Sequence, residues 1–127
     1  MLPVFSTLIK SGTGTIYPVG HTLAHAPSDK DGAWPHRAVR DLLQKLSSED
    51  VERGIETERQ NMRGVVTKAM FEGGDQERTL ARQARSWAKA AEEWPRTHEM
   101  LLRLAERWEA WGADEDERAK QDGMRYE

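Results

Sequence analysis

Two stretches on either side of the dipeptide Trp94-Pro95 carry apolar residues at helical spacing, and this pattern constrains the fold most. From residue 75 to 94 there is no Gly or Pro, and the apolar spacings are 4, 3, 4 and 3: Leu80, Ala84, Trp87, Ala91 and Trp94. After Pro95 the spacings are 3, 4 and 3: Leu101, Leu104, Trp108 and Trp111. Such spacings place the residues on one face of each helix. The sequence therefore predicts an antiparallel, Trp-rich helical hairpin, with Trp87 and Trp108 in one core.

Two further helices are predicted before the hairpin, which gives an all-α fold class. Val39 to Leu46 is amphipathic and should cover the open flank of the hairpin. Ser47 and Ser48, followed by Glu49 and Asp50, should supply the N-cap and first-turn acids of a second helix that runs to about residue 63 and is expected to be mostly solvated. Its acids should form an exposed face: Glu49, Asp50, Glu52 and Glu56. Gly73-Gly74 marks a break, after which Asp75 and Thr97 are the expected N-caps of the hairpin helices.

The N-terminal segment differs from the helical part because it is rich in turn-forming residues and poor in charge. Val4 to Ile9 and Thr15 to Val19 are short β-prone runs around the turn Gly12-Thr13-Gly14, so a small β-hairpin is expected there. The predicted organisation is a loop-rich arm (1–34), a helical domain (35–120) and a frayed tail (121–127).

Length and composition narrow the class of protein. A chain of 127 residues has the size of one domain, and the absence of cysteine excludes disulfides, thiol nucleophiles and thiolate metal sites. No apolar run approaches the roughly 20 residues of a membrane-spanning helix, and Met1 is not followed by a secretory-signal pattern. A cytoplasmic protein with no membrane contact is expected. The net charge of −3 argues against nucleic acid as the main partner.

Several stretches resemble segments shared by uncharacterised proteins of actinobacterial genomes. They are residues 21–35, residues 63–78 and Trp94-Pro95-Arg96-Thr97, and the resemblance spans about residues 21 to 120. It implies a bacterial origin. No activity and no functional residue is implied by it.

Histidines and carboxylates near the N-terminus form one candidate metal site: His21, His25, Asp29, Asp31 and His36. The spacing of the first two would place both imidazoles on one side of a helix, as in some zinc enzymes. Pro18 and Gly20 before the pair argue against a helix there. A loop packed down by Trp34 explains the same residues without metal, and any metal bound would be zinc or another borderline divalent ion.

Four basic residues of the first hairpin helix fall on one narrow stripe: Arg78, Arg82, Arg85 and Lys89. Such a stripe could bind an acidic protein partner or the phosphates of a nucleic acid, or it could be a solvated face. Because the aromatic residues belong to the hairpin seam, the stripe offers none for base stacking.

These observations favour a small non-enzymatic bacterial module, an adaptor or accessory protein that binds a protein partner or itself. No cofactor is expected, and no serine lies in a Gly-x-Ser-x-Gly setting that would indicate a catalytic nucleophile. One alternative is a metal-dependent hydrolase or ligand-binding domain that uses the N-terminal cluster. Another is nucleic-acid binding through the basic stripe.

Overall fold

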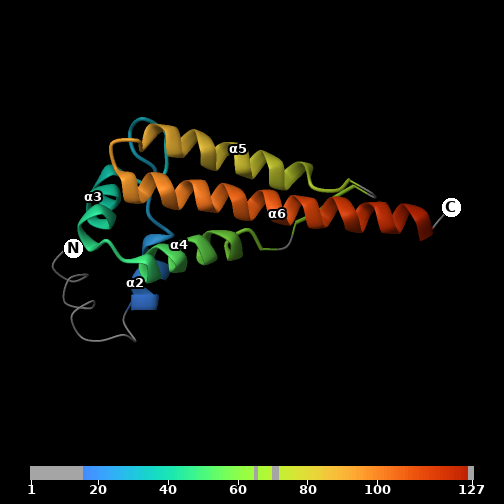
Figure 1. Ribbon diagram of the computed structural model, residues 1–127, viewed down its shortest axis with the longest axis horizontal. Coiled ribbons are helices and arrows are strands. Elements are labelled where there is room, and N and C mark those ends of the chain that lie inside the picture. Colours follow the sequence, from blue (N-terminus) through green and yellow to red (C-terminus); the bar gives the residue numbers. More distant parts are fainter. Residues whose placement is uncertain (1–15, 65, 70–71, 126–127) are drawn as a thin grey trace.

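The structure, a computed structural model, describes residues 16–64, 66–69 and 72–125. Five helices follow one another in the described ranges: α2 (Ile16–Leu23), α3 (Arg37–Leu46), α4 (Glu49–Asn61), α5 (Asp75–Ala90) and α6 (Pro95–Arg125) (Figure 1). These ranges contain no strand, which confirms the all-α class for this part of the chain. None of these helices is both long enough and apolar enough to cross a membrane.

Helices α5 and α6 lie side by side and antiparallel, joined by the short turn at residues 91–94 (Figure 1). The buried apolar residues of α5 are all alanines, and a further buried alanine follows in the turn: Ala81, Ala84 and Ala88, then Ala91. The buried face of α6 carries larger residues: Met100, Leu101, Leu104 and Trp108. Small side chains on one helix let the larger ones of the other fill the space between the two backbones. The paired helices thus have a closely packed seam.

Not all of the residues that the apolar spacing places in the seam between α5 and α6 are buried there. Trp87 and Trp94 are only half-buried and pack against the edge of the core, whereas Trp108 is buried and Trp111 is 37% exposed. The ring of Trp87 meets that of Trp34, with centroids 5.7 Å apart. The large aromatic rings therefore border the seam and bridge it to other elements.

Two glycines allow the closest approach of α6 to the start of α5. A Cβ on Gly74 would lie 2.2 Å from the carbonyl oxygen of Gly112, and a Cβ on Gly112 would lie 3.3 Å from the Cβ of Glu77. No side chain fits between these backbones. The break at Gly73-Gly74 is thus also a packing contact.

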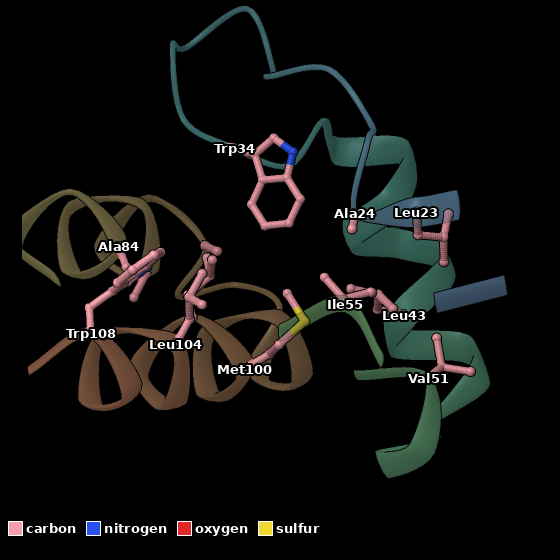
Figure 2. Close-up of a cluster of buried hydrophobic side chains, with 14 of the residues drawn as sticks. Leu23, Ala24, Trp34, Leu43, Val51, Ile55, Ala84, Met100, Leu104 and Trp108 are labelled. Carbon is pink, nitrogen blue, oxygen red and sulfur yellow. The ribbon is translucent and has the colours of Figure 1, made fainter. Parts of the chain in front are cut away.

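The remaining helices cover one flank of this pair. Helices α3 and α4 both contact α6, and α2 packs against α4. Figure 2 shows Met100 of α6 directed toward Ile55 of α4 and Leu43 of α3, where Leu23 of α2 also lies. One continuous core therefore joins all five helices.

The N-terminal segment is more ordered than its turn-forming composition indicates. Residues 16–19 of the expected second strand lie in α2, and the strand expected at Val4 to Ile9 lies outside the described residues. Pro18 is compatible with this helix because it lies in the first turn, where backbone N–H groups have no intrahelical acceptor. Helix α6 likewise continues as far as Arg125, beyond the expected start of a frayed tail at 121.

The predicted caps agree with the structure only in part. Of the two serines expected to cap α4, Ser48 is the N-cap, its hydroxyl accepting a backbone N–H of the first turn at 3.2 Å, whereas Ser47 is the C-cap of α3. Asp75 was the wrong residue for α5, whose N-cap is Gly74 with no side-chain bond. Thr97 is also not a cap: α6 begins at Pro95, which suits the first helical position, and Thr97 is buried in the first turn.

The close approach at Gly74 predicts that Gly74→Ala lowers the free energy of unfolding by about 1–3 kcal/mol, because the added methyl group meets backbone. Gly123→Ala is the matched control in α6. A Cβ there meets nothing within 4 Å, so this change should stabilise the protein by about 0.5–1 kcal/mol through helix propensity. Urea unfolding measures both. Equal stability of the two variants would contradict the close approach.

Candidate functional site

The structure divides the predicted His/Asp cluster into two groups that contact different helices. His21 and His25 face α4, where they meet a carboxylate. Asp29, Asp31 and His36 interact with α3 instead. The five residues therefore do not form one metal site.

Asp29 is buried and belongs to the start of α3. Its carboxylate accepts from Arg37 Nη2 at 2.9 Å and from the Arg37 backbone N–H at 3.2 Å. The Arg37 hydrogen bonds hold the pKa of Asp29 well below its usual range, although burial opposes this. His36 caps the same helix by accepting the N–H of Ala38 at 3.1 Å. Both residues are accounted for by the geometry of the turn before α3.

Asp31 is similarly engaged with a buried arginine. Arg40 Nη2 lies 3.4 Å from Asp31 and donates to the carbonyl of Ala33 at 3.2 Å, while its Nε donates to the carbonyl of Pro35 at 2.7 Å. The guanidinium carbon also lies 5.0 Å from the ring centroid of Trp94. This arrangement fixes the loop that follows α2 onto α3 and onto the turn between α5 and α6.

His21 and His25 converge on Glu58, a residue that sequence spacing does not indicate. His21 Nδ1 lies 3.2 Å from Glu58 Oε1, and His25 Nε2 lies 2.9 Å from Glu58 Oε2. One ligand atom from each residue can be chosen so that all three lie within 4.8 Å of one another. The His21–His25 spacing was a useful signal, because His21 lies in α2 and His25 lies in the turn that directly follows this helix, so both side chains reach α4. The third member lies on α4, more than thirty residues further along the chain.

Close packing of α2 on α4 positions this cluster. A Cβ on Gly20 would lie 2.7 Å from the carbonyl oxygen of Val51 and 3.2 Å from the Cα of Gly54. Two hydrogen bonds fix the turn after α2. Arg59 Nη1 donates to the carbonyl of Ala24 at 3.2 Å, and Trp34 Nε1 donates to the carbonyl of Ala26 at 2.8 Å. The backbones that carry both histidines are thus tied to α4.

The basic stripe of α5 is partly neutralised by acids of α6. Arg78 Nη1 lies 2.6 Å from Asp116, and Arg85 forms an ion pair with Glu109. The Gly74 N–H and Arg78 both donate to Asp116, and these bonds lower the pKa of that carboxyl. Two of the four predicted cations therefore hold the hairpin together.

The other two members of the stripe lie on the surface. Arg82 and Lys89 are exposed, and Arg82 Nη2 donates to Thr79 Oγ1 at 3.0 Å. The stripe thus offers an approaching partner fewer available charges than the sequence indicates.

Of the four acids expected on a solvated face of α4, two are exposed and two are buried. Glu49 and Asp50 are exposed as predicted. Glu52 and Glu56 are buried, so the prediction was wrong for them. The difference arises because α6 supplies arginines opposite the second pair.

These contacts form a row of ion pairs between α4 and α6. Glu52 receives Arg96 Nε at 2.8 Å and Arg103 Nη2 at 3.0 Å. Glu56 receives Arg103 Nε at 3.2 Å and lies 3.5 Å from Arg107. Burial raises the pKa of Glu56 more than Arg103 lowers it. We call these five residues the α4–α6 ion-pair row.

A fourth buried acid, Glu77, holds the segment between α4 and α5. Its carboxylate contacts Arg63 and Lys68, and Lys68 Nζ also donates to the carbonyl of Gly73 at 2.8 Å. Burial raises the pKa of Glu77, but hydrogen bonds from Lys68 and Arg63 outweigh it and lower the pKa below its ordinary value. The end of α4 is thereby connected to the start of α5.

Arg63 also lies against an aromatic stack. Its guanidinium carbon is 5.4 Å from the ring centroid of Trp108 and 5.3 Å from that of Trp111. The two indoles are stacked, with centroids 5.4 Å apart and an interplanar angle of 23°. Met62, the residue before Arg63, is exposed. We call Met62, Arg63, Trp108 and Trp111 the tryptophan rim.

Two surface hollows border the tryptophan rim. One, of about 250 Å³, lies between α4, α5 and α6 and is lined in part by Leu80, Leu104 and Trp108. The other, of about 360 Å³, lies between α4 and α6, beside Trp111, and is lined by polar residues as well: Gln60, Arg107, Asp114 and Arg118. The rim thus borders one hollow with apolar side chains in its lining and one hollow with charged side chains in its lining.

Comparisons of the chain with protein-family models, with curated proteins and with solved structures find no match.

The Glu77 network predicts a pH-dependent stability. Because the pKa of Glu77 is lowered in the folded state, its stabilising effect is present above the unfolded pKa of about 4.5 and is lost as pH falls below it. Glu77→Gln should cost about 3–5 kcal/mol at pH 7, since it leaves the buried guanidinium of Arg63 without its carboxylate partner, and should flatten the acid dependence of unfolding. Glu109→Gln, in an exposed pair, should cost at most about 1 kcal/mol. Similar losses for both variants would contradict the role of Glu77.

Proposed function

We propose that the protein is a small non-enzymatic helical binding module, an adaptor that binds a protein partner at the tryptophan rim. The observation that carries this proposal is Trp111, which is 37% exposed yet held in place by stacking on Trp108 and by Arg63. Tryptophan and arginine supply most of the binding energy in many protein interfaces. A fixed indole also loses little conformational entropy when a partner binds.

The hollows indicate the chemistry of the partner. The recess lined by Leu80, Leu104 and Trp108 suits one apolar side chain. Arg118 lines the second hollow, its side chain is 70% exposed and its contact with Glu115 is as long as 3.5 Å, so a carboxylate beside that apolar side chain would be favoured there. A partner segment with an apolar residue flanked by acids fits both features. A second copy of this chain, which carries acids at 114–117 of α6, is one candidate source.

The same geometry gives less support to the basic stripe as the binding surface. Arg78 and Arg85 already pair with α6, so an acidic partner or a nucleic acid would have to compete with Asp116 and Glu109. The hydrolase alternative is also less favoured, because only two of its five proposed ligands lie together and the two hollows beside the rim are lined by other residues.

Site-specific photo-crosslinking in cells tests this proposal. A benzoylphenylalanine at position 111 should give a discrete adduct, and the same group at position 89, on the basic stripe, should give none. Both positions are exposed on folded helices, so the comparison is matched. The mass of the adduct distinguishes a second copy of this chain from another protein.

Adducts from position 89 alone would assign the partner to the stripe and contradict the proposal. Absence of a discrete adduct from position 111, with the variant expressed and folded, would contradict it as well.

A further inference from the structure

We propose that His21, His25 and Glu58 bind a divalent transition-metal ion of the zinc class, in a site that is open to solvent on one side. The inference is independent of the partner proposed for the tryptophan rim, because none of its three residues belongs to that rim and the cluster lies where α2 packs against α4.

The distances require only small movements for coordination. Zinc bound to imidazole nitrogen and carboxylate oxygen at about 2.0–2.2 Å in a tetrahedron separates its ligand atoms by roughly 3.3 Å. Candidate ligand atoms of the three residues already lie within 4.8 Å of one another, and both imidazoles touch Glu58 at 2.9–3.2 Å. The ring centroids of His21 and His25 are 5.8 Å apart, with planes inclined by 47°. Side-chain rotation therefore suffices to close the site.

The backbone positions of the ligands are fixed before any metal binds. Gly20 allows α2 to approach Val51 and Gly54, and Arg59 ties the carbonyl before His25 to the helix that carries Glu58. Ligands on such a fixed frame lose little entropy on coordination. This distinguishes the cluster from exposed histidines and acids that meet by chance on flexible loops.

Burial differs among the three ligands in a way that suits an open site. The Glu58 side chain is 13% exposed, whereas those of His21 and His25 are 49% and 53% exposed. The carboxylate would hold the ion from the protein side, and water would complete the coordination from solvent. Three protein ligands with one open position is the arrangement of zinc sites that exchange a ligand.

The donor set selects the class of metal. Two imidazole nitrogens and one carboxylate oxygen favour zinc and its neighbours over calcium or magnesium, which prefer oxygen ligands alone. The N-terminal residues Asp29 and Asp31, which sequence grouped with the histidines, are bound by Arg37 and Arg40 and take no part.

Zinc titration of the full chain, freed of metal by chelation, tests the proposal. Calorimetry should show one zinc ion per chain, and cobalt should give a visible absorption spectrum. His25→Ala and Glu58→Gln should each weaken zinc binding by at least about 10-fold, because loss of a ligand exceeds the effect of changes around it. His25 is exposed, so its variant should fold, which circular dichroism checks.

His36→Asn is the matched control, because it removes a histidine of the same sequence cluster and Asn still caps α3. Zinc binding of this variant should equal that of the native chain. No stoichiometric binding by the native chain, unchanged affinity in His25→Ala, or an equal loss in His36→Asn would each overturn the proposal.

Discussion

The α4–α6 ion-pair row is the contact on which the rest of the structure depends. Helix α2 packs on α4, so wherever α4 lies, α2 and its histidines follow. Glu52 and Glu56 contribute to the row, and Glu58, two residues further on, receives His21 and His25. A buried ion pair often adds little net stability over an apolar contact, but removing one partner leaves a charge unpaired. We infer that the row fixes the register of α4 on α6.

Arginines over tryptophans supply the second set of links between the helices. Each of the five tryptophans has a guanidinium over its ring, and the pairs are Arg40 with Trp94, Arg59 with Trp34 and Trp87, and Arg63 with Trp108 and Trp111. Arg59 lies near the end of α4 and Arg63 just after it, so these contacts fix the end of α4 between α5 and α6. Cation–π contacts strengthen when they are desolvated, as at Arg59, whose pKa burial lowers. The contact with Arg63 also holds the ring of Trp111 in place at the surface.

Sequence reasoning predicted the features that depend on local spacing. The apolar periodicity indicated helices at 75–94 and 95–111. The acids that follow Ser47 and Ser48 indicated a cap at these two serines, and the structure uses Ser48. It could not predict the burial of Glu52, because an acid on a polar helix looks the same whether its opposite face is water or an arginine more than forty residues away. Gly20 was interpreted as a helix breaker, yet it is needed for contact with α4. Glu58 became a candidate ligand only once α2 was placed against that helix.

A double-mutant cycle between Glu52 and Arg103 tests the role of the ion-pair row most directly. Glu52→Gln, Arg103→Met and the double variant would be compared by urea unfolding at pH 7. Because the two side chains meet at 3.0 Å across α4 and α6, the account predicts a coupling free energy of at least about 1 kcal/mol. Additive effects, within about 0.5 kcal/mol, would contradict the account, since residues that do not touch show no more coupling than that.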